Sequence, residues 1–386
     1  MLKAYASGSS IPSPAEAGAE AALKAAQALS DIKLAFVYSG VQYDQKALLD
    51  SISEKLPGVP LIGNTSFTGV ITPEGFITGD GGFVGVFALA GDLEVGVAIV
   101  EKEECAREAG KKAALEALKA AGKNVPPALF YMVAPPGEEE FFLKGITEVI
   151  GRVPFFGGSA ADNSISGDWL LFTDKAVSAN AVAVAFIYTD SPFANVFTGA
   201  YDETANVGII TKLEGKRTLV EIDGVPAVKK YAEWTSQNPD DILGGNLLVA
   251  TITAPLGVKD RLGDLTAIRH PMFGNDNYSM NIGANLAVGT AVIQMQGSVD
   301  KLIASAPEAI DKVIEKLGQK PQALHLVHCG GRRAGIGDRI EELAEAVKKA
   351  AGDIPFIVEF TFGEYGYEDD GNNTTGGLML SFTAFA

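Results

Sequence analysis

Four short stretches of the sequence combine glycines with polar or charged side chains, and each directly follows a segment predicted to be a buried strand. Open α/β sheets bind ligands at the carboxyl ends of their strands, and glycines let backbone amides approach a ligand closely. One such stretch could equally be a tight turn, but four at equivalent places favour a shared ligand pocket. The stretches are Gly63-Asn64-Thr65-Ser66, Gly157-Gly158-Ser159-Ala160-Ala161-Asp162-Asn163, Cys329-Gly330-Gly331-Arg332-Arg333 and Gly363-Glu364-Tyr365-Gly366.

Two adjacent arginines, Arg332 and Arg333, belong to the third stretch. A guanidinium presents a rigid fork of N–H donors that matches a carboxylate or a phosphate. In a chain whose formal net charge is −17, such a pair indicates recognition of an anion. The alternative is a structural salt bridge with Glu364 or Asp338.

Cys329 is a candidate nucleophile. Alternate residues of a strand share a face, so His325 lies on the same face as Cys329, and His328 lies on the other. His325 would be roughly 13 Å away along the strand, which is too far for a catalytic dyad, so a buried apolar cysteine is favoured. Ser159 also follows two glycines, but Asp162 is a poor base at its ordinary pKa.

The three histidines, His270, His325 and His328, lack the spacing of a zinc site, although a single histidine can ligate haem iron. The motifs G-x-x-x-x-G-K-[ST], H-E-x-x-H and G-x-S-x-G, which indicate phosphate binding, metalloproteases and serine hydrolases, are not found. We therefore expect no cofactor, with haem as an alternative.

The composition indicates a globular protein of two or three domains, because 47% of the 386 residues are apolar and 20% are charged. The negative net charge disfavours nucleic acid and anionic membrane surfaces as partners. The sequence lacks a run of about 20 apolar residues and a signal-peptide pattern. With only Cys105 and Cys329 as cysteines, it fits the reducing cytoplasm.

A repeated β-α-β pattern organises the chain, with 26 residues from strand start to proline in the first two copies and 32 in the third. The fold class is therefore α/β, with mixed α+β as the alternative, built from repeated β-α-β units and mixed sheets in two modules. The insertion 330–337 lengthens the third copy. The copies are Leu34–Ser39 with Pro60-Leu-Ile-Gly63, Ala128–Val133 with Pro154-Phe-Phe-Gly157, and Ala323–Cys329 with Pro355–Phe360.

The stretch 201–224 carries less apolar material and is interpreted as joining two halves. We expect a first module over 1–200 with two internal copies, a linker over 201–219, and a second module over 220–386. Within the second module, Val225–Gln237 is predicted to be a helix, and Gly245–Thr253 is predicted to be a strand.

The chain resembles the FIST family of paired N-terminal and C-terminal sensory modules, with the N-terminal module over about 31–215. It departs from the family pattern at one place, where Gly69-Val70 stands in for a common Gly-Glu step. The resemblance rests on Pro60-Leu-Ile-Gly63, Thr65-Ser66, Phe156–Asp162, Ile222–Ala227, Ile268-Arg269, Cys329-Gly-Gly-Arg332, Phe362-Gly-Glu364 and Asn373-Thr374.

The resemblance implies a sensory protein that binds a small ligand, an amino acid or another small anionic metabolite. Its signal would pass to a separate histidine kinase or cyclase, and some members are reported as haem proteins that sense nitric oxide. The alternative is a hydrolase or transferase that uses Cys329 or Ser159, but an enzyme is the less favoured interpretation.

We expect the ligand in a cleft where the glycine-rich strand ends meet. Arg332, with Arg333 or Arg269, would clamp an anionic group, and Glu364 would pair with an ammonium group or orient an arginine. No metal site is expected. The candidate ligand-binding residues are Asn64, Thr65, Ser159, Asp162, Asn163, Arg269, Cys329, Gly330, Arg332, Arg333, Glu364 and Asn373.

Overall fold

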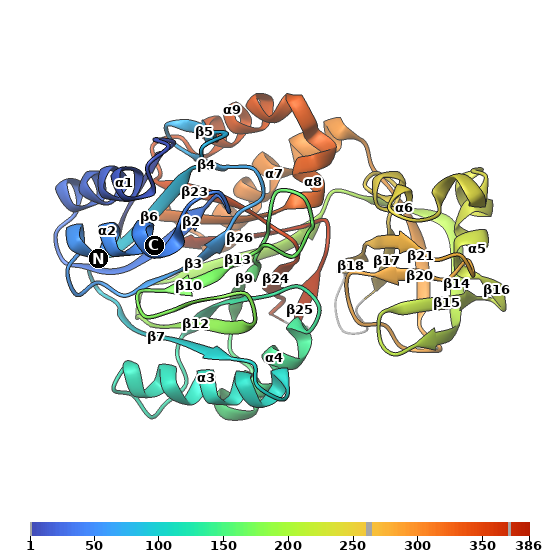
Figure 1. Ribbon diagram of the computed structural model, residues 1–386, viewed down its shortest axis with the longest axis horizontal. Helices are drawn as coiled ribbons and strands as arrows, with labels where there is room; N and C mark the ends of the chain where they lie inside the picture. The colour runs from blue at the N-terminus through green and yellow to red at the C-terminus, as the bar shows by residue number, and fades with distance from the viewer. Residues whose placement is uncertain (1, 260–264, 370–371) are drawn as a thin grey trace.

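A main body of three sheets and a smaller domain beside it make up the molecule (Figure 1). The structure is a computed structural model that describes residues 2–259, 265–369 and 372–386. Its fold is mixed α/β, as the sequence predicted.

The first copy of the repeat contains two helices, three main strands, a short hairpin and a returning strand. In space the strands run β1-β6-β2-β3, with β2 and β3 parallel and β6 antiparallel to both of its neighbours. The elements are β1 (Lys3–Ser9), α1 (Pro14–Ala28), β2 (Ile32–Ser39), α2 (Gln45–Lys55), β3 (Leu61–Thr65), β4 (Val70–Thr72), β5 (Gly75–Ile77) and β6 (Val84–Ala90).

The second copy repeats this order along the chain and in space. Its main strands lie in the order β7-β12-β8-β9, again with the last two strands, β8 and β9, parallel. The elements are β7 (Glu94–Glu101), α3 (Ala106–Ala120), β8 (Leu129–Ala134), α4 (Glu139–Ile150), β9 (Phe155–Ser159), β10 (Leu171–Thr173), β11 (Val177–Ser178) and β12 (Ala181–Tyr188).

The third copy has the same strand order, β13-β26-β22-β23. The insertion that the sequence places at 330–337 forms the short helix α8 and the first residue of the 3-10 turn η2. The elements are β13 (Phe193–Gly199), α7 (Val299–Leu317), β22 (Ala323–Cys329), α8 (Gly330–Ile336), η2 (Gly337–Arg339), α9 (Ile340–Ala351), β23 (Phe356–Thr361), β24 (Glu364–Tyr367), β25 (Asn373–Gly376) and β26 (Met379–Phe385).

The glycine of the repeated Pro-apolar-apolar-Gly pattern allows close approach of the parallel strands. A Cβ atom added to Gly63 would lie 1.7 Å from the carbonyl oxygen of Val37, and one added to Gly157 would lie 2.0 Å from that of Met132. Only glycine fits at these two equivalent positions. The third copy has Val358 there instead.

The hairpin of each copy pairs with the sheet of another copy. β10 pairs with β3 of the first copy, β4 pairs with β23 of the third, and β24 pairs with β9 of the second. The three copies therefore close into a ring. Equivalent side chains meet at its centre, where the ring centroids of Phe36, Tyr131 and His325 lie 4.8–5.6 Å apart.

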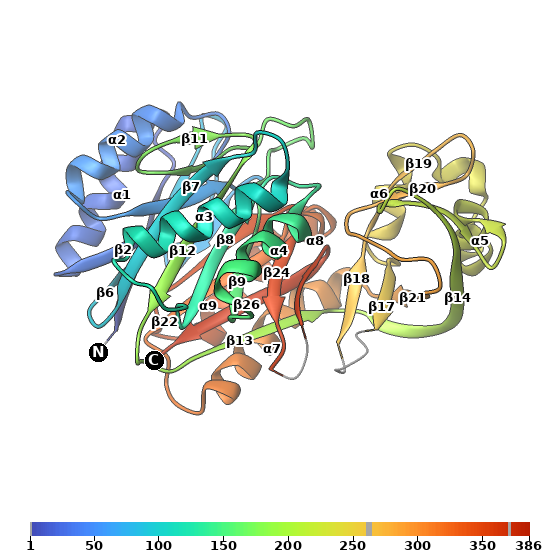
Figure 2. The same cartoon turned by 90° about the horizontal axis from the view of Figure 1, so that it is seen from below.

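The smaller domain contains an antiparallel sheet (Figure 2). The sheet packs around a core of its own, which includes Ile210, Leu219, Tyr231 and Val292. Its elements are β14 (Asp202–Glu214), β15 (Thr218–Ile222), β16 (Val225–Pro226), α5 (Ala227–Thr235), η1 (Pro239–Ile242), α6 (Asn246–Thr251), β17 (Leu256–Lys259), β18 (Thr266–Arg269), β19 (Pro271–Gly274), β20 (Met280–Ile282) and β21 (Ala291–Gln296).

The smaller domain is an insertion into the third copy, between β13 and α7. The stretch 201–219, expected to be a linker, is largely the 13-residue strand β14, which pairs with β15 and β21. The backbone pairing on both sides explains why a segment with little apolar material is ordered here. The predicted division at 200 and 219 treats the chain as linear, whereas the fold interrupts one repeat with the smaller domain.

The predicted strand Gly245–Thr253 is wrong, because residues Asn246–Thr251 form the helix α6. Short apolar runs do not distinguish a strand from a helix by period alone. Leu247 and Thr251, one helical turn apart, are buried, whereas Val249 is 69% exposed, so burial follows the helical period.

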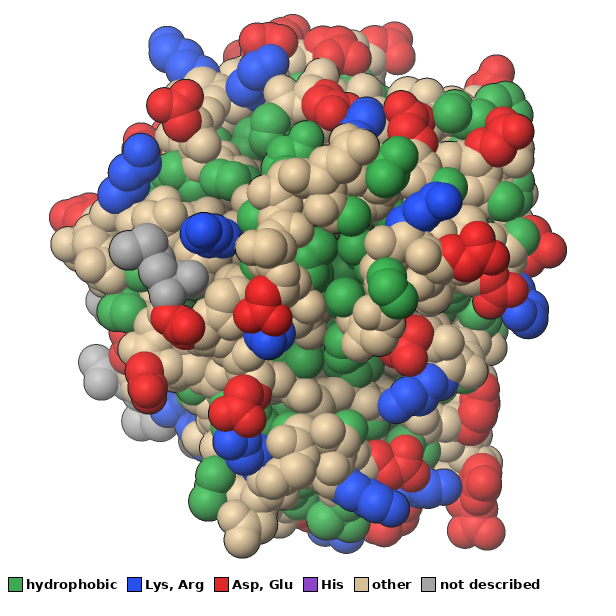
Figure 3. Space-filling view, turned by 90° about the vertical axis from the view of Figure 1, so that its left-hand side faces the viewer, with side chains coloured by type: hydrophobic (Ala, Val, Ile, Leu, Met, Phe, Trp, Pro, Cys, Tyr) green, Lys and Arg blue, Asp and Glu red, His purple; other side chains and the backbone are tan. Residues whose placement is uncertain are grey.

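Figure 3 shows the end of the main body that faces away from the smaller domain. Acidic and basic side chains are scattered over this face among apolar ones, without a large patch of one charge. Across residues 2–259, 265–369 and 372–386, none of the helices combines the length and the apolar character needed to cross a membrane.

Candidate functional site

The glycine-rich stretches converge, but they pack directly against one another. The N–H of Ala161 donates to the carbonyl of Thr65 at 2.9 Å, and the N–H of Ser159 donates to that of Gly363 at 2.8 Å. A Cβ atom on Gly330 would lie 3.2 Å from both Phe67 and Phe362. Asn64, Ser159, Cys329 and Glu364, which the sequence places in these stretches, are all buried in the main body.

Asn64 belongs to a buried polar network at the centre of the ring. Its side-chain amide donates to Glu359 at 3.1 Å and accepts from the hydroxyl of Tyr131 at 3.0 Å, and the oxygen of that hydroxyl lies 3.3 Å from Oε1 of Glu359. Tyr38 lies 2.5 Å from Nε2 of His325 in the same network. Burial raises the pKa of Glu359 to about 8 and lowers that of His325 to about 3, so both groups are neutral near pH 7.

Cys329 and Glu364 are held by backbone groups. The Cys329 Sγ accepts from the N–H of Leu378 at 3.1 Å, and burial raises the pKa of its thiol, so the thiolate is disfavoured. Glu364 accepts from the Thr361 hydroxyl at 3.0 Å and from the N–H of Met379 at 2.8 Å. Burial raises the pKa of Glu364 to about 8.

The two adjacent arginines do not form a fork toward a cavity. Arg332 is fully buried and donates to the carbonyl of Leu302 at 3.0 Å and to Ser305. Among the described residues, it has no salt bridge with Glu364 or Asp338. Arg333 donates to the carbonyl of Gly337 at 3.0 Å, and its guanidinium lies 5.2 Å from the ring centroid of Phe76.

The remaining polar side chains of the first two stretches stabilise turns. Asp162 accepts from four backbone N–H groups between residues 164 and 168. Asn163 accepts from the N–H of Thr68, and Thr65 exchanges hydrogen bonds with the backbone of Leu170. Ser159 lies 3.1 Å from Oε1 of Glu139 and 2.7 Å from the hydroxyl of Tyr365.

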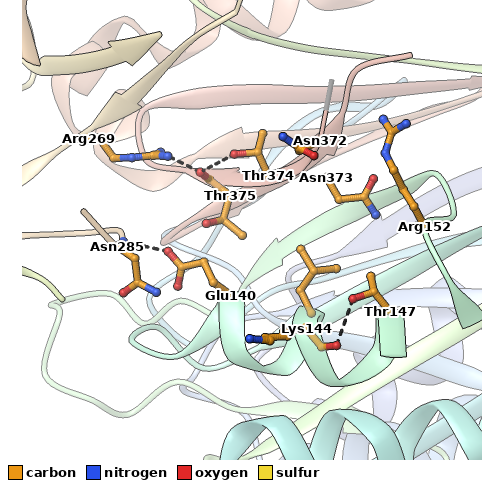
Figure 4. A pocket seen from close by; sticks show the side chains of 11 residues that line it. Glu140, Lys144, Thr147, Arg152, Arg269, Asn285, Asn372, Asn373, Thr374 and Thr375 are labelled. Atoms are coloured by element: carbon orange, nitrogen blue, oxygen red, sulfur yellow. Dashed lines mark hydrogen bonds between the residues drawn. The ribbon is translucent and has the colours of Figure 1, made fainter. Parts of the chain in front are cut away.

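A groove lies instead between the main body and the smaller domain. It consists of two adjoining cavities of about 390 and 440 Å³, which share Glu140, Lys144, Arg269 and Asn285. In Figure 4, side chains of α4 line one side of the first cavity, and residues 372–375 line the other. The remaining lining residues are Leu143, Thr147, Arg152, Asn372, Asn373, Thr374 and Thr375 in the first cavity, and Phe141, Lys216, Val258, Leu286, Ala287 and Thr290 in the second.

Arg269 connects the two cavities at the end of β18. One terminal nitrogen donates to the carbonyls of Thr375 at 2.9 Å and Ile268 at 3.3 Å, while its Nε is buried without a hydrogen-bond partner. Within the described ranges, no carboxylate lies at salt-bridge distance from it. Burial lowers the pKa of Arg269, and the charge of Glu140 opposes this shift without forming a salt bridge with the arginine.

Glu140 faces Arg269 across the groove, and its carboxylate accepts hydrogen bonds from residues of the smaller domain. Its Oε1 accepts from the N–H of Asn285 at 2.8 Å, and its Oε2 accepts from Arg217 at 2.6 Å. Arg217 also contacts the buried Glu139, whose pKa is raised by burial. These contacts join the start of α4 to the smaller domain.

The groove is basic, although the chain as a whole is acidic. Four cationic side chains and one acidic side chain line it, which gives a formal charge of +3: Arg152, Lys144, Lys216, Arg269 and Glu140. The net charge of the chain is −17, so the groove differs in sign from the chain as a whole. Such a concentration of positive charge attracts anions.

Of the residues predicted from the sequence, the groove brings together Arg269 and Asn373. Sequence reasoning missed Glu140, Lys144, Lys216 and Asn285. The run of three glutamates that opens α4 was the one available signal for Glu140. Nothing in the sequence alone relates residue 140 to residue 285.

The described residues contain no group of three or more histidine, cysteine or acidic side chains placed to hold a metal ion. His270, His325 and His328 are buried, and none of them lines the groove. Cys329 and Ser159, the candidate nucleophiles of the alternative hydrolase or transferase, do not line it either.

Two family models match the chain, the FIST N domain over residues 33–225 and the FIST C domain over residues 227–367. The chain belongs to the FIST family. FIST domains are described as sensory domains that bind small ligands. No curated protein matches the chain.

Several solved structures are similar to the chain at low sequence identity. They include a cyanuric acid hydrolase from A. caulinodans (11% identity, TM-score 0.39) and a chorismatase (10%, TM-score 0.36), each matched over 100% of this chain and 99% of the other. PurLQS from Thermotoga maritima matches at 10% identity over 100% and 72% of the two chains, with a TM-score of 0.26. These TM-scores lie below 0.5, so the likenesses carry no argument about function.

Proposed function

We propose that this FIST protein senses a small anionic metabolite of the amino-acid class, which it binds in the groove between its two domains. The missing salt-bridge partner of Arg269 carries the proposal. Arg269 lines both cavities of the groove, its buried Nε has no hydrogen-bond partner, and no carboxylate among the described residues lies at salt-bridge distance from it. A ligand carboxylate would supply the counter-ion that this arginine lacks.

The rest of the groove suits the other parts of an amino acid. Glu140 uses one lone pair of each oxygen for Asn285 and Arg217, so acceptor capacity remains for a ligand ammonium group. Leu143, Val258 and Leu286 provide apolar contacts for a side chain. Each cavity also has a volume typical of small-molecule sites.

Binding in this groove would bias the arrangement of the two domains. Arg269, Asn285 and Lys216 belong to the smaller domain, whereas Glu140 and Lys144 belong to the main body. A ligand that contacts both sides favours the arrangement in which both sets of contacts form. That change would be the signal, and a separate histidine kinase or cyclase is the proposed receiver.

The test is calorimetry with the natural amino acids and small carboxylates on the wild-type protein, Arg269→Gln and Arg269→Lys. We expect the glutamine variant to lose about tenfold or more in affinity, since a charge-assisted hydrogen bond is worth about 1.5–3 kcal/mol. The lysine variant keeps the charge but not the fork, so its loss should be smaller.

The matched control is Arg339→Gln, which removes an exposed arginine that pairs with Asp300 and Glu342 away from the groove. Its affinity should equal that of the wild type. The proposal fails if no compound binds the folded wild-type protein, or if Arg269→Gln binds every ligand as tightly as the wild type does.

A further inference from the structure

The groove carries more positive charge than one carboxylate needs. After Arg269 is matched to a ligand carboxylate, Lys144 and Lys216 still line the second cavity. Among the described residues, neither lysine has a hydrogen-bond or ion-pair partner for its ammonium group. The second cavity is lined by three cations, Lys144, Lys216 and Arg269, and by one carboxylate, Glu140, so its net charge is positive and a bound anion relieves the repulsion among the cations.

We propose that the ligand carries two anionic groups, one bound by Arg269 and the other by Lys144 and Lys216. This inference rests on the proposed function and names the ligand class of the same site. The class is that of small dicarboxylates, acidic amino acids included.

Arg152 is the other cation of the groove, but its hydrogen bonds are already committed. It donates to the carbonyls of Glu368 and Asp369 at the far end of the first cavity. Figure 4 shows it at the opposite end of this cavity from Arg269. The unpartnered charge therefore lies toward the second cavity, where Lys216 is found.

The two lysines come from different domains. Lys144 is exposed on α4 of the main body, and Lys216 is exposed in the turn between β14 and β15 of the smaller domain. An anionic group between them would be held from both sides. The second charge of the ligand would thus add both to affinity and to closure of the groove.

The test compares ligands of similar shape that differ by one negative charge. Calorimetry on the full chain would measure glutamate against glutamine, aspartate against asparagine, and succinate against butyrate. We expect the dianionic member of at least one pair to bind about 2–30-fold more tightly, because the second anionic group gains two exposed charge pairs, one with each lysine. A parallel titration with glycerol phosphate distinguishes a phosphate from a second carboxylate.

The double variant Lys144→Gln/Lys216→Gln should remove this preference, because it weakens binding of the dianionic partner more than binding of the monoanionic one. The control is Lys212→Gln, which removes an exposed lysine of the same domain that does not line the groove. Equal affinity within all three pairs, or a preference that survives the double variant, overturns the inference. If none of the six compounds nor any of the wider panel binds, it is the proposed function that fails.

Discussion

Glu140 lets the two parts of an amino acid be tested separately. The Glu140→Gln substitution keeps an oxygen for the N–H of Asn285 but removes a negative charge from the groove. We expect amino acids to bind about 3–10-fold more weakly, because their ammonium group loses its counter-ion, and glutarate to bind more tightly, because one repulsion is gone. Calorimetry with glutamate and glutarate measures both effects.

The opposite direction of the two effects distinguishes a ligand contact from a structural role. If Glu140→Gln merely loosened the contact with Arg217 and Asn285, both ligands would lose affinity together. Glu116→Gln, on the exposed face of α3, is the control for the change of net charge. A loss or a gain shared by both ligands would contradict the assignment of Glu140 to the ammonium group.

Glu359 makes the stability of the main body depend on pH. Burial raises its pKa from 4.5 to about 8, so between these values the folded state binds a proton that the unfolded state releases. The free energy of unfolding therefore falls as pH rises from about 4.5 to about 8, by up to about 1.4 kcal/mol per pH unit. Below this window the carboxyl is protonated in both states and contributes no pH dependence.

Glu359→Gln imitates the protonated side chain and should remove this dependence. Urea unfolding at pH 5 and pH 8 would measure the difference in the free energy of unfolding between wild type and variant. We expect the free energy of unfolding of the variant to increase relative to that of the wild type as pH rises. Glu364, which is also buried, contributes equally to both proteins. Parallel curves from pH 5 to pH 8 would show that Glu359 is already ionised in the folded state.

At the scale of elements, the repeat could be predicted from the sequence because residue spacing and glycine positions are local features. The spacing of 26 residues and the glycines Gly63 and Gly157 mark strand, helix and return strand in two copies, and the third copy follows with a longer connection. The order of the strands and the exchange of hairpins between copies could not be predicted from the sequence, because β4, β10 and β24 pair with strands far away in sequence. A short apolar run such as 245–253 stayed ambiguous until its burial was known.

The candidate site was predictable only in part, for the same physical reason. Glycine-rich strand ends indicate where an open sheet binds ligands, but here the exchanged hairpins cover those ends. The side chains of Asn64, Ser159 and Glu364 form hydrogen bonds with other side chains of the protein. The cavity forms where a second domain meets the first, and that meeting has no signature in local sequence.

The whole molecule is a closed ring of three copies with a domain inserted into the third. The two ends of the insertion lie side by side, because Asp202 pairs with Gln296 where β14 meets β21. The ring itself needs no strand of the smaller domain, since its sheets contain only β1–β13 and β22–β26. This arrangement separates the part that stabilises the fold from the part that completes the groove.

A chain in which a short Gly-Ser link replaces residues 202–296 should therefore fold. We expect native-like circular dichroism and slow hydrogen exchange in β2, β8 and β22, with a lower unfolding temperature, because Phe197 and Met379 lose apolar cover from Ile268 and Met295. Ligand binding should vanish, because Arg269, Asn285 and Lys216 leave with the insertion. An unfolded product would show instead that the smaller domain is needed to hold the third copy together, and that the ring is not an independent folding unit.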